Sequence, residues 1–206
     1  GEVADLIAGY MKKNNGLITK ADLKNYKPVW REPVRGNYKE YEIVTMPPPS
    51  SGGIHIIQML NILEHYNLPE MGHNSPTYVA LLAEVMKYAY ADRSKYLGDP
   101  DFFDVPVAQL ISKEYAKEVN SRIELNQITP SDKILPGDAM PHESMDTTHF
   151  SVADQFGNVT SNTYTLNSGF GSGIIVEGTG VLMNNEMDDF VSAPGIPNQF
   201  GLIGGE

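Results

Sequence analysis

The clearest candidates for chemistry are hydroxyl side chains carried on two short segments of alternating residues. Thr147 opens the run 147–153 (TTHFSVA), and a second run, 159–166 (VTSNTYTL), is rich in β-branched residues. Alternation with a period of two and β-branched composition both indicate strands. Between the runs, Asp154 to Asn158 (DQFGN) supplies turn residues, and Gly157 is suited to a left-handed position. We therefore predict a β-hairpin with one buried face.

The register of this hairpin would gather polar groups at its open end. If Asp154 opposes Asn158, then Thr147 lies opposite Thr165. Directly opposed residues point to the same side of a sheet, so Thr163 and Asn167 would share that face. Three hydroxyls and an amide would then meet. Threonine is also a common strand residue, and composition alone favours that simpler interpretation.

A pair of carboxylates follows in the run 182–190 (LMNNEMDDF). Glu186 and Asp189 are three residues apart and could bracket an ammonium group with charge-assisted hydrogen bonds. Taken alone, they also fit an acidic surface turn, which is the more common case. A cation site is a further alternative, but the run lacks the alternating ligands and central glycine of a calcium loop. We therefore expect no metal here.

Composition excludes several classes of function. The 206 residues carry a formal net charge of −11 and no cysteine. An acidic chain without basic runs, zinc-finger or phosphate-loop motifs is not expected to bind nucleic acid. The absence of cysteine removes disulfides and thiolate nucleophiles. No apolar run reaches the roughly 18 residues of a membrane span, and no cofactor motif is present. A helical pattern begins at once, so we expect the chain to be part of a longer protein.

Helical spacing of apolar residues predicts helices over 3–13, 54–66, 76–97 and 112–123, and a hairpin or strand pair over 35–44. Thr19 is expected to cap one helix start, and either Asn74 or Ser75 to cap another. We expect residues 181–183 to form a short buried strand and 126–145 to form a mobile tail. The apolar stripe expected to pack in the core comprises Val79, Leu82, Val85, Met86, Ala89 and Tyr90.

Several motifs, in order, resemble those of the γ-glutamyltranspeptidases. They are MPPPSSGG (46–53), YAYADR (88–93), TTHFSV (147–152), TYTLN (163–167) and LMNNEMDDF (182–190). The resemblance covers essentially the whole chain. It implies an α+β fold, the αββα sandwich of the N-terminal-nucleophile hydrolases, incomplete in this chain.

The resemblance also implies that the protein is made as one inactive chain that cuts itself between Asp146 and Thr147. Residues 1–146 would be the C-terminal part of a large, mainly helical subunit, and 147–206 the N-terminal part of a small subunit with a central hairpin. Thr147 would be the nucleophile and Thr165 its neighbour. The resemblance implies that Asn167 contacts the α-carboxylate of the substrate, and that Glu186 and Asp189 bind its α-amino group.

The implied activity is γ-glutamyl transfer from glutathione or other γ-glutamyl compounds to water, amino acids or peptides. Alternatives are a poly-γ-glutamate depolymerase, a cephalosporin acylase, or a non-enzymatic homologue that binds amino acids. The family's substrate-binding arginine, paired serines and oxyanion glycines would lie in the remainder of the two subunits, so we expect this stretch alone to be inactive. A periplasmic or secreted location is expected from the resemblance.

Overall fold

The computed structural model describes residues 1–125, 127–134, 147–189, 193 and 196–199. Most of the expected tail, residues 126 and 135–145, lies outside this range. The chain divides into two compact units, residues 1–29 with 142–203, and residues 30–141 with 204–206. Helices and short antiparallel sheets occur together, so the class is mixed α/β, which agrees with the expected α+β class at that level.

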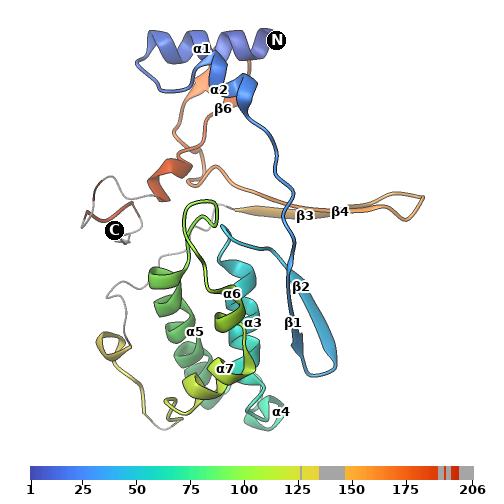
Figure 1. Cartoon of the computed structure of the whole chain (residues 1–206), viewed down its shortest axis with the longest axis vertical. Coiled ribbons are helices and arrows are strands. Elements are labelled where there is room, and N and C mark those ends of the chain that lie inside the picture. The colour runs from blue at the N-terminus through green and yellow to red at the C-terminus, as the bar shows by residue number, and fades with distance from the viewer. Residues whose placement is uncertain (126, 135–146, 190–192, 194–195, 200–206) are drawn as a thin grey trace. The chain divides into compact units, whose positions relative to one another are not determined.

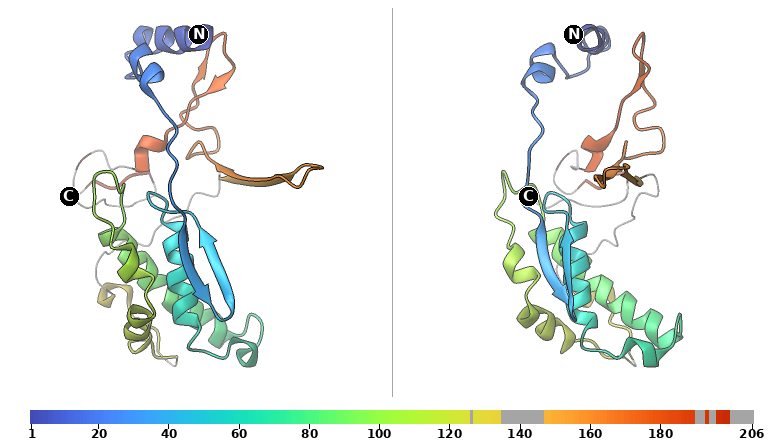
Figure 2. Two further views of the ribbon diagram at one scale, coloured as in Figure 1. Left: turned by 45° about the vertical axis from the view of Figure 1, so that its right-hand side comes forward. Right: turned by 90° about the vertical axis from the view of Figure 1, so that its right-hand side faces the viewer.

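The unit of residues 30–141 is built from helices and one hairpin (Figures 1 and 2). The hairpin expected over 35–44 is confirmed as β1 (Val34–Tyr38) and β2 (Tyr41–Thr45), which pair antiparallel. The helices are α3 (Gly52–Leu63), α4 (Leu68–Met71), α5 (Pro76–Tyr96), α6 (Val107–Leu110), α7 (Lys113–Asn120) and the 3₁₀ turn η1 (Ser131–Lys133).

Helix α3 lies at the centre of this unit, where it contacts α5, α7 and β1. Ile54 and Ile57 pack with Val34 of β1 and Leu110 of α6, and the other end of α3 packs on α5 and α7 through Ile62, Leu63, Leu81, Val85, Ala116 and Val119. Gly36 allows the close approach of β1, because a Cβ there would lie 2.6 Å from Cγ2 of Ile57. The core of the unit therefore consists of two clusters of buried side chains, both of which include residues of α3.

Local helix signals were predicted well, whereas the buried stripe of α5 was predicted only in part. Ser75 accepts a hydrogen bond from the Tyr78 N–H, as an N-cap should. Val85 and Ala89 are buried, but Val79 and Met86 are exposed, at 52% and 38%. The buried face of α5 instead includes the polar residues Glu84 and Asp92, and α3 and α7 each present a polar partner to Asp92.

Asp92 is the polar centre of this interior. Its carboxylate accepts hydrogen bonds from the Tyr115 hydroxyl, at 2.9 and 2.8 Å, and from the Gln58 side-chain amide. The residue is only 6% exposed, and burial raises the pKa of Asp92 despite these two donors. An acid whose pKa is raised by folding destabilises the folded state in its charged form. This destabilisation is absent below the pKa that Asp92 has in the unfolded chain, and it grows as pH rises from there through the raised pKa of the folded state.

We predict that Asp92→Asn in the full-length protein removes this pH dependence and keeps or raises the melting temperature at neutral pH. An amide can still accept from Tyr115 and can donate to Oε1 of Gln58, a buried atom without a hydrogen-bond partner among the described residues. Asp92→Ala should instead cost about 2–4 kcal/mol, since two buried donors lose their acceptor. Thermal unfolding across pH tests both, with the exposed Asp104→Asn as control. A variant Asp92→Asn as pH-sensitive as the wild type would contradict the assignment.

The other unit contains the remaining elements, which include the first residues and the predicted hairpin. They are α1 (Glu2–Lys13), α2 (Lys20–Asn25), β3 (Thr148–Ala153), β4 (Val159–Tyr164), β5 (Ile175–Val176), β6 (Val181–Leu182) and the 3₁₀ helix η2 (Glu186–Asp189). Thr19 caps α2 through a capping box with Asp22. Leu6 of α1 lies against Gly178, in the turn between β5 and β6.

The prediction that residues 181–183 form a buried strand was wrong on burial. β6 exists, but Val181 is 38% exposed, because among the described residues the strand pairs only with the two-residue strand β5, in which Val176 is the buried member. Among the helices that the structure describes, none combines the length and apolar character needed to cross a bilayer.

Candidate active site

The hairpin that carries Thr147 has the predicted register. Ala153 pairs with Val159, and the ladder runs to Thr148 opposite Tyr164. Gly157 in the turn has φ +85°, and the Asp154 N–H donates to the Asn158 carbonyl at 3.0 Å. Hydrogen bonds from the side chain and backbone of Asn158 lower the pKa of Asp154, so its carboxylate stabilises the turn in its charged form.

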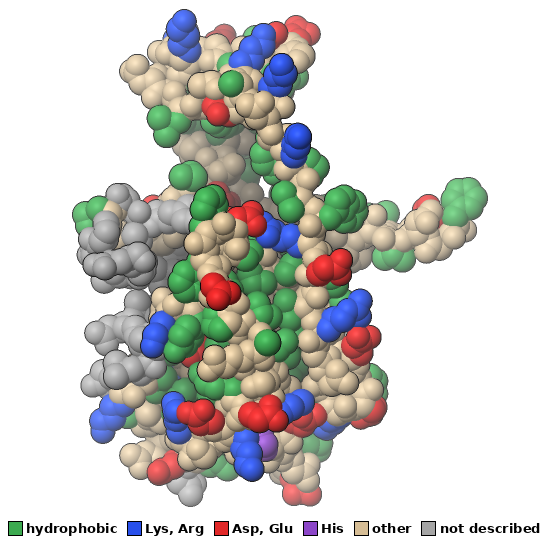
Figure 3. Space-filling view, viewed as in Figure 1, with side chains coloured by type: hydrophobic (Ala, Val, Ile, Leu, Met, Phe, Trp, Pro, Cys, Tyr) green, Lys and Arg blue, Asp and Glu red, His purple; other side chains and the backbone are tan. Residues whose placement is uncertain are grey.

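Neither face of this hairpin is buried, contrary to the half-buried strand expected from the sequence. Every residue of β3 is exposed, including Phe150 at 43% and Val152 at 56%. Hydrophobic side chains are accordingly visible on the surface of the hairpin (Figure 3). Phe150 packs edge-to-face on Tyr164 with ring centroids 6.4 Å apart. The apolar face has formed, but no described residue covers it.

The opposite face of the hairpin is a row of polar side chains centred on His149. Nδ1 of His149 and the Thr163 hydroxyl share a hydrogen bond of 2.6 Å, and Nε2 and the Ser161 hydroxyl share one of 3.0 Å. Ser151 extends the row with a 3.1 Å bond to Ser161. Sequence reasoning overlooked His149, although it has the same parity as Thr147 and so belongs to the same face of the strand.

Thr147 itself precedes the first ladder pair and is exposed. Extending the register by one step sets it opposite Thr165, as predicted, but the paired strands end at Thr148 and Tyr164. The Thr165 hydroxyl accepts a hydrogen bond from the Asn167 N–H at 2.9 Å. Thr165 therefore shapes the turn that leaves β4, and its relation to Thr147 stays a prediction from the register.

Asn167 has an unusual backbone conformation, with φ +75°, and is 4% exposed. Asparagine tolerates this left-handed region better than most residues. Its side-chain amide donates to the Asn185 carbonyl at 3.2 Å, 18 residues along the chain. The amide is thus fixed beside the segment that begins η2, and a structural reason for asparagine exists beside the functional one.

Glu186 and Asp189 are the first and last residues of η2. Residues three apart on a 3₁₀ helix lie one above the other, so these two carboxylates share one side of it. Partial burial raises the pKa of Glu186, and the negative charge of Asp189 raises it further. A positively charged group between the two carboxylates would relieve this repulsion.

The structure therefore links Thr165, Asn167 and η2 through short contacts, and it leaves Thr147 at the head of the adjacent strand. Gly171 (φ +52°) secures the packing of this region, because a Cβ there would lie 2.3 Å from the Met183 carbonyl oxygen. Among the described residues, no group of three or more His, Asp or Glu side chains is placed to hold a metal ion.

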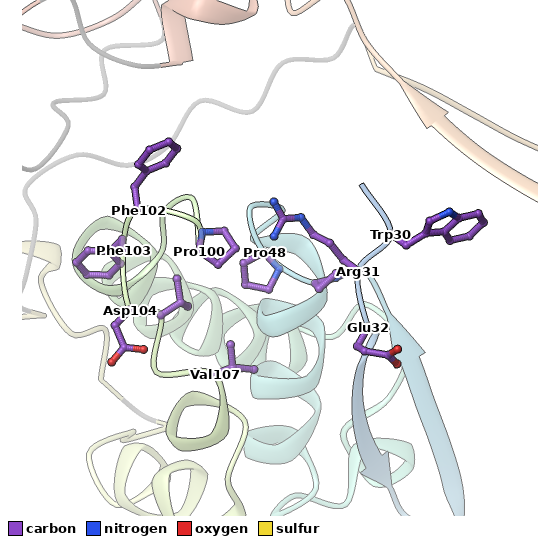
Figure 4. A pocket seen from close by; sticks show the side chains of 11 residues that line it. Trp30, Arg31, Glu32, Pro48, Pro100, Phe102, Phe103, Asp104 and Val107 are labelled. Atoms are coloured by element: carbon purple, nitrogen blue, oxygen red, sulfur yellow. The ribbon is translucent and has the colours of Figure 1, made fainter. Parts of the chain in front are cut away.

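A pocket of about 620 Å³ lies elsewhere, in the unit of residues 30–141, and contains none of the predicted site residues (Figure 4). Pro48 and Pro100 form part of its wall, and Arg31, which pairs with Asp101 at 2.9 Å, forms another part. Trp30 at its edge is fully exposed. The described residues that line the pocket include no serine, threonine, histidine or lysine, so the candidate site remains the hairpin and η2.

Comparison with known proteins identifies the relatives of this chain. The family model described as gamma-glutamyltranspeptidase matches residues 1–206. The glutathione hydrolase proenzyme of Escherichia coli (strain K12) is 52% identical over 206 residues, which cover the whole of this chain and 36% of that protein. The chain thus spans about a third of the length of such curated relatives.

Two solved structures are similar in fold. The gamma-glutamyltranspeptidase of Helicobacter pylori is 49% identical with a TM-score of 0.64, covering 70% of this chain and 42% of that one. A cephalosporin acylase from Bacillus halodurans is 31% identical with a TM-score of 0.70, covering 90% of this chain and 32% of that one.

Proposed function

This chain belongs to the γ-glutamyltranspeptidase family, and on that premise we propose that the full-length protein transfers γ-glutamyl groups through an ester on Thr147. The donors would be glutathione and other γ-glutamyl compounds, and the acceptors water, amino acids or peptides. The observation that carries the proposal is the position of Thr147 at the head of β3, in the unit that also holds Asn167 and the η2 carboxylates.

Activation requires cleavage before Thr147, because an internal threonine lacks a base on its own residue. The Thr147 hydroxyl attacks the Asp146 carbonyl carbon, the acyl group moves from nitrogen to oxygen, and water hydrolyses the resulting ester. The products are a carboxylate on Asp146 and a free α-amine on Thr147. This amine has a reference pKa of about 7.7–8.0, which suits a general base near neutral pH.

The transfer cycle then follows nucleophilic catalysis. The α-amine takes the hydroxyl proton as the Thr147 oxygen attacks the γ-carbonyl of the donor, and the proton passes to the departing amine. The γ-glutamyl ester remains until water or an acceptor amine attacks it and regenerates the hydroxyl. Thr165 would orient the Thr147 oxygen during both reactions.

Recognition of the donor would use its free amino-acid end. The amide of Asn167 suits an α-carboxylate, and the paired carboxylates of Glu186 and Asp189 suit an α-ammonium. The mutual repulsion of this carboxylate pair supports the assignment, since an ammonium between them would offset it. Together, the amide and the carboxylate pair favour donors that carry both an α-carboxylate and an α-ammonium.

A cephalosporin acylase or poly-γ-glutamate depolymerase remains the alternative, and the structural likeness to the Bacillus halodurans acylase favours keeping the former. Comparing glutathione, poly-γ-glutamate and glutaryl-cephalosporin as substrates separates the three. N-terminal sequencing of the mature protein separates an enzyme from a non-catalytic binder. The enzyme yields a fragment that begins at Thr147, whereas a binder stays intact.

The proposed subunit boundary also defines the complete fold. Residues 1–146 would belong to the large subunit and 147–206 to the small subunit of an αββα sandwich. The exposed apolar face of the β3–β4 hairpin supports this proposal, because further strands and a second layer would cover it. The remaining parts of both subunits would be its partners.

Donor binding should weaken at acidic pH through Glu186. Because burial and Asp189 raise the pKa of Glu186, its charge is lost at a higher pH than that of an ordinary carboxylate. We expect KM for γ-glutamyl-p-nitroanilide to rise by about tenfold as pH falls through the raised pKa of Glu186, since one charge-assisted contact is lost. Glu186→Gln should flatten this rise and leave the pH profile of kcat unchanged. An unchanged KM profile in the variant would contradict the assignment.

A further inference from the structure

Asn185 binds the segment that leaves β4 with both its backbone and its side chain. Its N–H donates to the Leu166 carbonyl at 3.1 Å, and its own carbonyl accepts from the Asn167 side-chain amide at 3.2 Å. Its Oδ1 accepts from the Ser168 N–H and its Nδ2 donates to the Ser168 hydroxyl, both at 3.1 Å. One residue thus fixes three consecutive positions of the segment 166–168.

The same residue begins the helix that carries the carboxylate pair. The Asn185 carbonyl also accepts from the Asp188 N–H at 3.1 Å, which closes the first turn of η2. A single carbonyl oxygen therefore joins the Asn167 amide to the frame of η2. If Asn185 moved, the amide and the carboxylate pair would move relative to each other.

Gln199 closes this arrangement from a third segment. Its N–H donates to Oδ2 of Asp188 at 3.0 Å, and its Oε1 accepts from the Ser168 hydroxyl at 3.2 Å and from Nδ2 of Asn185 at 3.4 Å. The side chain of Asn185 is thus held by two partners, which limits its own rotation.

We propose that Asn185 is a positioning residue that fixes the separation between the amide of Asn167 and the carboxylates of Glu186 and Asp189, and that it thereby selects donors bearing both an α-carboxylate and an α-ammonium. This inference rests on the proposed function of those three residues. Asn185 itself does not touch the substrate. Its contribution is to hold two anchors, the Asn167 amide and the carboxylate pair, at the distance that suits an α-carboxylate and an α-ammonium carried on the same carbon.

The spacing matters only to a ligand that reaches both anchors at once. Such a ligand binds well when the two sites are already at the right distance, and it loses affinity when they fluctuate. A ligand with only one of the two groups occupies one anchor and is indifferent to the position of the other. General damage to the fold would weaken all ligands alike.

The test compares three competitive inhibitors of γ-glutamyl-p-nitroanilide hydrolysis in the full-length protein. L-Glutamate carries both α-groups, glutarate lacks the amine, and 4-aminobutanoate lacks the α-carboxylate. For Asn185→Ala we expect the inhibition constant of L-glutamate to rise about tenfold, with less than about a twofold change for the other two. KM of the donor should rise in parallel with L-glutamate, and kcat should change little.

Two further variants complete the test. Asn158→Ala removes a comparable side-chain hydrogen bond in the hairpin turn, where it bonds Asp154, and should leave all three constants unchanged. Ser168→Ala removes only the hydroxyl that accepts from Nδ2 of Asn185, while the backbone N–H of residue 168 still donates to Oδ1. It should show a smaller effect of the same pattern, even if Asn185→Ala fails to fold. An equal loss for all three inhibitors, or no loss for L-glutamate, would overturn the proposal. A wild-type protein that neither cleaves itself nor uses γ-glutamyl donors would instead refute the proposed function, and this inference with it.

Discussion

Thr147→Ala in the full-length protein should leave the bond after Asp146 intact and lower γ-glutamyl turnover by about 10⁴-fold or more. Both losses would have one cause, because in the proposed mechanism the same hydroxyl performs the first attack in cleavage and in transfer. Removing the nucleophile of a comparable catalytic unit costs as much as removing the whole unit. Denaturing gel electrophoresis reports the cleavage, and release of p-nitroaniline from γ-glutamyl-p-nitroanilide reports the turnover.

The adjacent threonine provides a matched control. Thr148 begins β3 and points to the opposite face of the strand, on the side of Phe150. Thr148→Ala should therefore cleave and turn over at close to the wild-type rate. Thr147→Ser retains the hydroxyl and should cleave, though more slowly, because serine lacks the methyl group that restricts rotation. Full activity of an uncleaved Thr147→Ala protein would refute the mechanism.

Asp189→Ala should raise KM for γ-glutamyl donors by about 10- to 100-fold, with a smaller effect on kcat. The α-ammonium would lose one of its two charged partners, and hydrogen bonds to charged groups contribute about 1.5–3 kcal/mol. Donor kinetics with γ-glutamyl-p-nitroanilide measure this directly. Affinity for glutarate, which lacks the amine, should not fall.

Asp188 serves as the control for this change, because it is also a carboxylate of η2 but accepts a hydrogen bond from the Gln199 N–H. Asp188→Asn keeps an acceptor oxygen and should leave KM nearly unchanged. If Asp188→Asn and Asp189→Ala raised KM equally, the loss would reflect the acidity of the turn rather than a specific contact.

The hairpin could be predicted to the residue because its determinants are local. Turn chemistry at Asp154 to Asn158 fixes the pairing, and alternation then assigns each side chain to a face. Burial was not predictable in the same way. The apolar face around Phe150 calls for a partner layer, and the described residues do not supply one. The exposure of Val79 on α5 has a similar origin, since burial depends on neighbouring elements and not on periodicity alone.

The sequence alone was enough to propose the reacting groups of the candidate site, but not the residues that hold them in place. Glu186 and Asp189 stand out by charge and spacing. Asn185 does not, because its partners lie 17 to 19 positions back along the chain, at residues 166–168, and 14 positions ahead, at Gln199, where no periodic pattern records them. The side chain of Asn167, a residue in the left-handed conformation, likewise bonds across that distance to the Asn185 carbonyl. His149 could have been found from strand parity.

The place where the β3–β4 ladder begins has a consequence for a chain nicked before Thr147. The first interstrand pair is Thr148 with Tyr164, so a break in the backbone one peptide earlier removes no rung of the ladder. The new terminus would stay tethered to a preformed scaffold while the severed end departs. Maturation could therefore proceed without refolding, and the new amine would lie one residue before the paired strands.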